Sequence, residues 1–99
     1  NNREFEMEMI ELFLEQVPAE LSGMDQAIQK TEHSRVREVA HKLKSSYSML
    51  GVQDQGLMQQ IEMQGAGGAP IGEIRQNFEK LHNITQLVIK ELNHILQEN

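Results

Sequence analysis

The chain has 99 residues, which suffices for one domain with a single hydrophobic core. Its 15 acidic and 9 basic residues give a net charge of -6, so a nucleic-acid partner is not expected. Cysteine is absent, which excludes disulfides and thiolate sites and suits the cytoplasm. No apolar run approaches the roughly 20 residues that span a bilayer, so this domain should not insert into a membrane, even if a parent protein is membrane-anchored.

The first predicted element is an amphipathic helix over residues 3–31. Pro18 interrupts this segment, and proline removes a backbone donor and clashes with the preceding turn. We therefore expect the N-terminal helix to be bent or split there. The apolar residues recur every three or four positions, the spacing of one helix face: Phe5, Met9, Leu12, Phe13, Val17, Leu21, Met24 and Ile28.

The second predicted helix covers residues 34–50. Ser34 is a plausible N-cap, and Gly51 provides a natural end. The apolar positions follow a spacing of four and three residues, which defines the face toward the core: Val36, Ala40, Leu43, Tyr47 and Leu50.

Two further helices complete the predicted fold. The third helix begins near Asp54 and ends at Gly65. The stretch GAGGAP, residues 65–70, is predicted to be a loop, and a long last helix starts at Pro70. Amphipathic helices with short connections are usually antiparallel neighbours. The sequence therefore predicts an all-α fold, an up-and-down antiparallel four-helix bundle.

His41 is the candidate functional residue of the second helix. On a helical wheel it falls about 140° from the core direction, so its imidazole should face water and act as a nucleophile. Lys44, one turn later, is placed to stabilise a phosphoryl group on His41. Arg37 is a second, weaker cation, and Ser45 with Ser48 forms a small polar strip on which a partner could dock.

The segment AHKLKSSYSMLG, residues 40–51, resembles the signature of the histidine phosphotransfer family. The resemblance extends loosely to ELFLEQVPAEL, residues 11–21, and to the helix containing Ile61 and Glu62. It implies that His41 accepts and donates a phosphoryl group, that Lys44 steadies its charge, and that small residues admit a receiver domain. The positions that match the family pattern are His41, Leu43, Lys44, Ser45, Ser46, Leu50 and Gly51.

Two positions depart from that family pattern. The family usually has Gly where this chain has Ser45, and a small residue where it has Tyr47. Serine adds a hydroxymethyl group to the docking face and bears on the choice of receiver. Tyr47 points toward the core and should fill it.

A metal site is the competing interpretation, because the pattern Glu-x-x-His occurs three times. Di-iron bundles use such pairs, but pointing inward from two different helices. Here the wheel turns most of these side chains outward, so we expect no metal site. The pairs are Glu38 with His41, Glu79 with His82, and Glu91 with His94.

The functional hypothesis is a single phosphotransfer domain over residues 1–99, excised from a longer hybrid sensor histidine kinase. It would take a phosphoryl group from the aspartate of one response-regulator receiver domain and pass it to another in two-component signalling. No ATP-binding motif is present, so no autokinase activity is expected, and Mg²⁺ would come from the receiver rather than from a cofactor of this chain. The alternative is a non-catalytic helical adaptor.

Overall fold

The computed structural model describes residues 2–98, and its regular structure is entirely helical. The four helices are α1 (Asn2–Gln29), α2 (His33–Met49), α3 (Leu57–Gly67) and α4 (Ile71–Gln97). The expected all-α class with four helices is confirmed. None of the helices in this part of the chain combines the length and the apolar character needed to cross a membrane.

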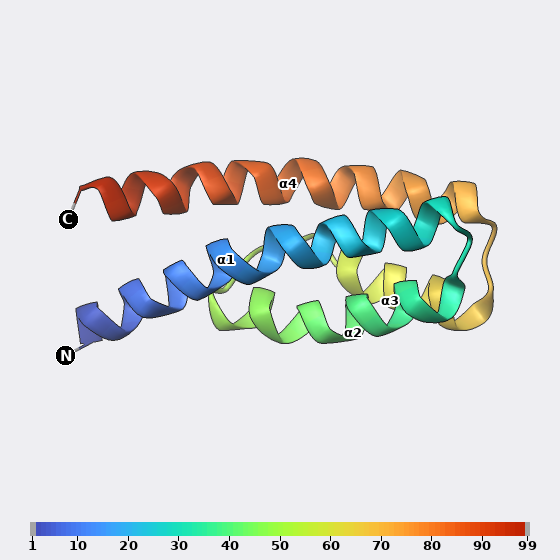
Figure 1. The fold of residues 1–99 in the computed structure, drawn as a ribbon, viewed down its shortest axis with the longest axis horizontal. Helices are drawn as coiled ribbons and strands as arrows, with labels where there is room; N and C mark the ends of the chain where they lie inside the picture. Colours follow the sequence, from blue (N-terminus) through green and yellow to red (C-terminus); the bar gives the residue numbers. More distant parts are fainter. Residues whose placement is uncertain (1, 99) are drawn as a thin grey trace.

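The helices form an elongated bundle of 44 × 21 × 20 Å. Each helix packs mainly on two others, so that the contacts close a ring from α1 to α2, α3, α4 and back to α1. In Figure 1, α1 leads away from the end that carries both termini, and α4 returns to it. The short α3 lies beside α2 at the opposite end of the bundle, so the site carried by these two helices lies far from the termini.

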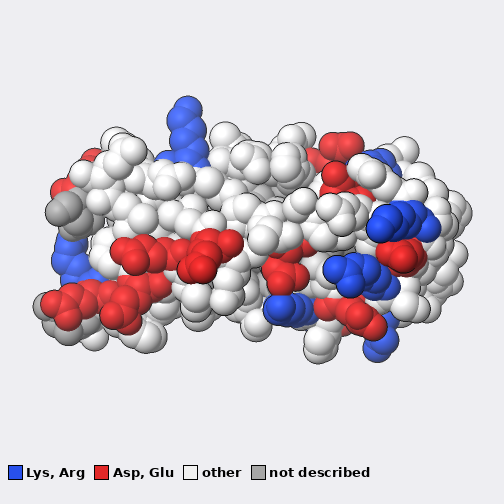
Figure 2. All heavy atoms as spheres, viewed as in Figure 1, with Lys and Arg blue, Asp and Glu red and all other residues white. Residues whose placement is uncertain are grey.

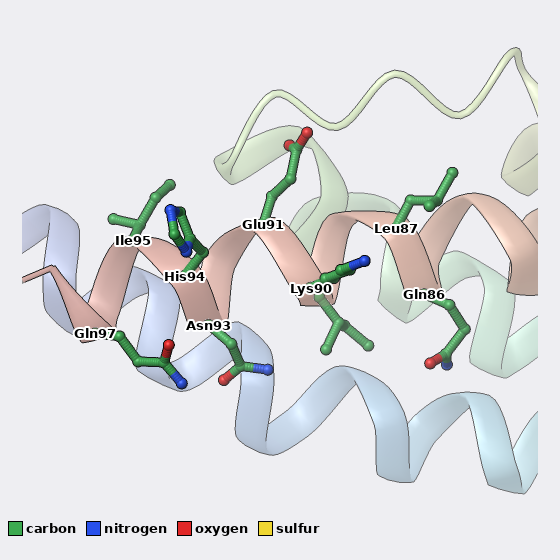
Figure 3. Close-up of a pocket in the computed structure, with 9 residues that line it drawn as sticks. Gln86, Leu87, Lys90, Glu91, Asn93, His94, Ile95 and Gln97 are labelled. Carbon is green, nitrogen blue, oxygen red and sulfur yellow. The ribbon is translucent and has the colours of Figure 1, made fainter.

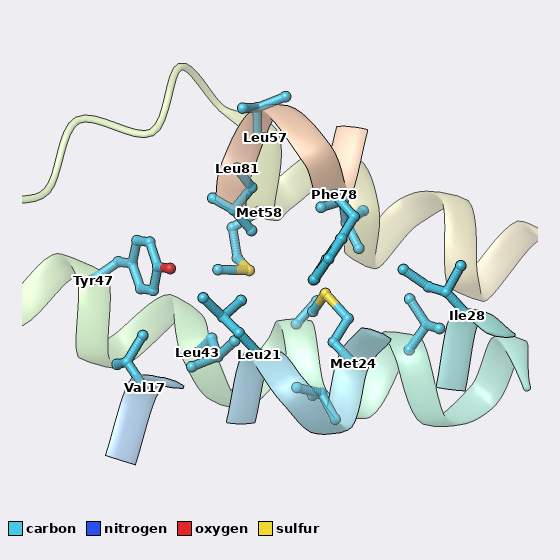
Figure 4. Close-up of a cluster of buried hydrophobic side chains, with 14 of the residues drawn as sticks. Val17, Leu21, Met24, Ile28, Leu43, Tyr47, Leu57, Met58, Phe78 and Leu81 are labelled. Atoms are coloured by element: carbon cyan, nitrogen blue, oxygen red, sulfur yellow. The ribbon is translucent and has the colours of Figure 1, made fainter. Parts of the chain in front are cut away.

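The core lies where all four helices meet. It contains aliphatic side chains, methionines and the rings of Phe13, Tyr47 and Phe78, and burial of each large apolar side chain contributes about 1.5–3 kcal/mol. Figure 4 shows side chains from the four helices pointing toward one another. Among the least exposed residues are Phe13, Val17, Met24, Val36, Leu43, Met58, Ile61, Ile74 and Leu81.

The helix α1 runs through Pro18 without interruption, so of the two alternatives expected there the split is wrong and the bend stays a prediction. Proline costs one backbone hydrogen bond, but Val17 and Leu21 on either side of it are buried, and their burial offsets that cost. The outer part of the predicted apolar stripe also differs: Phe5 is 62% exposed and Leu12 42%. Phe5 lies near the N-terminal end of α1, which extends beyond the shorter α2 and α3, whereas Leu12 lies between the buried Ile10 and Phe13 and faces away from the core.

Two predicted helix starts are corrected by the structure. The helix α2 begins at His33, and the residue at its N-cap is Glu32 without a capping side chain, so Ser34 is not the cap. The helix α3 begins at Leu57 rather than near Asp54. The Asp54 carboxylate nevertheless accepts hydrogen bonds from the backbone N–H groups of Gly56 and Met58, at 3.0 and 3.1 Å, and so stabilises the start of α3.

The predicted loop over residues 65–70 is shorter than expected, because α3 continues to Gly67. Gly68 adopts the left-handed conformation, with φ at 67°, and its N–H donates to the Gln64 carbonyl, a typical helix end. Gly65 is therefore a helical residue, and it is buried.

Tyr47, one of the two departures from the family pattern, lies in the core as predicted. Its hydroxyl donates to Thr85 Oγ1 at 2.6 Å, because the Thr85 hydroxyl itself donates to the Leu81 carbonyl at 2.8 Å. This buried chain of hydrogen bonds joins α2 to α4. Burial raises the pKa of the Tyr47 phenol to about 12.

Candidate functional site

His41 lies on the outer face of α2, and its side chain is 72% exposed. Its neighbours in sequence, Ala40 and Leu43, are buried in the core. The helical period of about 100° per residue therefore anchors α2 by one face and presents the imidazole on the other. The outward orientation is the one that the wheel predicts.

The imidazole of His41 is held from the neighbouring helix by Glu62 of α3. His41 Nδ1 and Glu62 Oε2 are 2.6 Å apart. The second carboxylate oxygen, Oε1, lies 2.6 Å from Lys44 Nζ. One carboxylate thus bridges the histidine and the lysine. The ammonium of Lys44 and the ring of His41, both hydrogen-bonded to it, hold the pKa of Glu62 below its usual range.

This contact fixes which nitrogen of His41 carries the proton. An ionised carboxylate only accepts hydrogen bonds, so His41 Nδ1 must donate to Glu62. In the neutral ring, Nε2 then has no proton and keeps its lone pair. The arrangement yields an exposed imidazole in a single tautomer, with Nε2 as the nucleophilic atom.

Lys44 is half-buried, with its side chain 37% exposed. Besides the Glu62 carboxylate, its ammonium contacts Gln59 Oε1 at 3.4 Å. It therefore lies between α2 and α3 on the same side as His41, which leaves a positive charge one turn from the imidazole. Lys42, by contrast, is directed to α1, where it pairs with Glu20 at 2.7 Å.

The three predicted docking residues lie on the exposed surface of α2. Arg37, Ser45 and Ser48 are all exposed. The Ser45 hydroxyl donates to the Lys42 carbonyl at 3.1 Å, so it is turned back onto its own helix. The hydroxyl proton of Ser45 is thus already engaged within α2, and its oxygen remains available as an acceptor.

The other histidines have different surroundings. His94 is exposed and pairs with Glu98, the residue just after α4, at 3.0 Å. His82 stacks on Phe78 with ring centroids 5.9 Å apart. His33, for which the sequence suggested no role, lies with its Nε2 2.7 Å from the Ala69 carbonyl oxygen. Within residues 2–98, no three His, Asp or Glu residues come together as a metal site would require.

An open groove along the C-terminal half of α4 is a separate surface feature. Figure 3 shows its lining residues, among them Leu87, Lys90, His94 and Ile95, all on α4. His41, Lys44 and Glu62 are not part of this groove. The candidate site is centred on an exposed side chain between α2 and α3, which suits a docking protein rather than an enclosed small molecule.

Charge is distributed unevenly over the molecule. Figure 2 shows acidic side chains along the N-terminal half of α1, whereas basic side chains gather toward the other end, among acidic ones. The helix α2 carries four basic side chains and one acidic one in a chain whose net charge is -6. His41 therefore lies on the most basic helix, where a phosphoryl group meets the least repulsion.

The geometry agrees with a comparison to known families. The model of the Hpt domain matches residues 8–97. The chain therefore belongs to the Hpt family, the histidine phosphotransfer domains of two-component phosphorelays. The comparisons with curated proteins and with solved structures each gave no match.

Glu62 is the site residue that sequence reasoning missed. It lies 21 residues from His41, and no spacing rule joins residues of different helices. Glu38 lies three residues before His41, about one turn away on the same helix, but it is not the residue that contacts the ring. The only sequence signal for Glu62 is that it follows an apolar residue, Ile61, which is buried. This signal does not specify how α2 and α3 are aligned along their lengths.

Proposed function

We propose that His41 is the phosphoacceptor of a relay, which takes a phosphoryl group from a receiver-domain aspartate and returns it to the aspartate of another receiver. The observation that carries this proposal is the contact between His41 Nδ1 and Glu62. In the neutral ring it leaves Nε2 of an exposed imidazole unprotonated, which is the state a nucleophile requires.

The transfer step balances without an added base. The Nε2 lone pair of neutral His41 attacks phosphorus, the bond between phosphorus and the aspartyl oxygen breaks, and the aspartate leaves as a carboxylate. Because Nδ1 keeps its proton, the phosphorylated ring carries a positive charge. The Glu62 carboxylate at 2.6 Å stabilises that charge as it develops. The reverse reaction, with a second receiver, uses the same contacts.

Lys44 stabilises the other charge of the reaction. Phosphoryl transfer spreads negative charge over the three equatorial oxygens, and catalysis comes mainly from position and nearby positive charge. The ammonium of Lys44 is one helical turn from His41 and is oriented by Glu62. Its place on the same side of α2 as His41 supports a role in stabilising a phosphoryl group on Nε2.

The partners are response-regulator receiver domains, as for the family. We infer that the receiver docks on the surface of Arg37, Ser45 and Ser48 and supplies the Mg²⁺ ion, since the carboxylate that contacts the imidazole, Glu62, is already bonded to His41 and Lys44. Net transfer in either direction then depends on the relative stability of the aspartyl phosphates.

We further infer an up-and-down antiparallel bundle with a bend at Pro18. The order of contacts between α2 and α3 supports the antiparallel part. His33 contacts Ala69, His41 contacts Glu62 and Lys44 contacts Gln59, so partners descend along α3 as they ascend along α2.

The test is phosphorylation by a receiver domain loaded with labelled phosphate. The wild-type chain should acquire an acid-labile, base-stable label, and His41→Gln should acquire none. His94→Gln is the matched control, because His94 is also exposed and also contacts a carboxylate. Equal labelling of His41→Gln and the wild type would exclude His41 as acceptor, and absence of label on the wild type with several receivers would favour the adaptor.

A further inference from the structure

Gly65 of α3 packs directly against the backbone of α2. A Cβ atom at this position would lie 2.9 Å from the backbone nitrogen of Arg37 and 3.0 Å from the carbonyl oxygen of His33. The first separation is shorter than real Cβ atoms show, the second is tighter than nine in ten real Cβ contacts, and both atoms are backbone, which cannot rotate away. Only glycine permits α3 to lie this close to α2.

His33 ties the two helices together at the same end. Its Nε2 donates to the carbonyl oxygen of Ala69, just past the end of α3, at 2.7 Å, and the ring is half-buried. Gly65 allows the close approach and His33 maintains it. Both residues lie outside the 40–51 segment that carries the family signature.

The separation of the two helices at Gly65 sets the position of Glu62, the residue that contacts the reactive histidine. Glu62 is three residues before Gly65 on the same face of α3, about 4.5 Å along the helix axis. Its carboxylate makes two contacts of 2.6 Å, to His41 and to Lys44. Charge-assisted hydrogen bonds weaken quickly beyond about 3 Å. A displacement of α3 by a few tenths of an ångström to one ångström would therefore weaken both contacts.

We propose that Gly65 is a positioning residue for phosphoryl transfer, which acts by setting the separation of α2 and α3 at which Glu62 holds His41 in its Nδ1–H tautomer. This inference rests on the proposed function of His41. It assigns a role to a glycine that contacts neither the imidazole nor a phosphoryl group, and it includes His33 as the hydrogen bond that keeps the two helices at this separation.

The first test measures the tautomer of His41 directly. In ¹⁵N-labelled protein, the ring nitrogen shifts of His41, assigned with His41→Gln, report the fraction of Nδ1–H. Gly65→Ala should lower that fraction. Gly67→Ala is the matched control, since Gly67 is in the same helix and a Cβ atom there would meet nothing within 4 Å. An unchanged tautomer in folded Gly65→Ala would overturn the proposal.

The second test separates positioning from general destabilisation. In the wild-type background, Gly65→Ala should slow phosphoryl acceptance about five- to fiftyfold, the scale of a displacement below 1 Å. In a Glu62→Ala background the same change should slow it less than about twofold, because the residue through which Gly65 acts is absent. Equal slowing in both backgrounds would reduce Gly65 to a packing residue and overturn the proposal.

The folded state of each variant is checked by far-ultraviolet circular dichroism. If Gly65→Ala does not fold, His33→Ala takes its place, because it removes the hydrogen bond between α2 and the end of α3 without adding an atom. An unchanged His41 tautomer in His33→Ala would then overturn the inference. The tautomer measurement requires no receiver. A wild-type chain that is never phosphorylated would therefore refute the proposed function while leaving the positioning of His41 to be decided by the ring nitrogen shifts.

Discussion

The α2–α3 face and the α1–α4 face of the bundle each carry a Glu-x-x-His sequence, yet they place the histidine in opposite surroundings. His41 is 72% exposed, and Glu62 from the adjacent helix holds its Nδ1. His82 lies half-buried on α4, stacked on Phe78, and its buried Nδ1 has no hydrogen-bond partner among residues 2–98.

The difference shows what a phosphoacceptor requires beyond a histidine on a helix. One ring nitrogen must be held by an acceptor and the other must reach a partner protein. The Nδ1 of His82 is held by no acceptor in the described part of the chain. The His82 ring is also less accessible to a partner protein, since it lines a groove together with Arg75, and Arg75 pairs with Asp25 of α1. Among residues 2–98, only the α2–α3 face brings a carboxylate from one helix onto a histidine of another.

The largest expected effect separates stability from chemistry. Phe78→Ala removes a core ring on the α1–α4 side and should lower the free energy of unfolding by about 3–5 kcal/mol. Phosphoryl transfer per folded molecule should remain unchanged, because Phe78 contacts neither His41 nor Glu62. Urea denaturation gives the first quantity and label transfer at low urea the second. A parallel loss of transfer in the folded fraction would show that the two faces are coupled.

The next effect concerns the carboxylate that distinguishes the two faces. Glu62→Ala should slow transfer to His41 about ten- to a hundredfold, the size of one lost charge-assisted hydrogen bond. Glu79→Ala, which removes the exposed carboxylate three residues before His82, should leave the rate within about twofold. Initial rates with one phosphorylated receiver measure both. Equal rates for both variants would remove Glu62 from the mechanism.

The hydrogen bond between the two faces predicts a pH dependence. Tyr47→Phe should cost about 0.5–1.5 kcal/mol of unfolding free energy near neutral pH. Burial raises the pKa of Tyr47 from 10.0 to about 12, so the neutral phenol contributes its full stability below about pH 10 and loses it as the pH rises toward 12. Thermal unfolding at pH 9–12 should show this decline in the wild type and a weaker one in Tyr47→Phe; identical curves would contradict it.

The smallest expected effect distinguishes the two lysines that follow His41 on α2. Lys44→Ala should slow transfer, or shorten the lifetime of phosphohistidine, about two- to fivefold, as for a partly exposed ion pair. Lys42→Ala, whose ammonium is directed to Glu20 of α1, should change neither. The decay of labelled, isolated protein gives the lifetimes, with helix content as the control. If Lys42→Ala had the larger effect, the assignment of the phosphoryl-stabilising cation would be wrong.

Sequence periodicity predicted the four helices and most of the core, because apolar side chains every three or four residues leave a helix one face to bury. Periodicity did not predict the structure at two places, at Pro18 within α1 and at the end of α3. The split at Pro18 did not occur because burial around it outweighs one lost hydrogen bond, and residues 65–67 are helical rather than loop because Gly65 packs against the backbone of α2.

The sequence by itself determined that His41 lies on the outer face of α2 with a cation one turn away, since both facts follow from the geometry of a single helix. Only the tertiary structure decided which carboxylate holds the ring. The register between α2 and α3 depends on backbone contact at Gly65 and on the bond from His33 to Ala69, and these join residues 28 and more positions apart. The tautomer of His41 is therefore a property of the packed bundle.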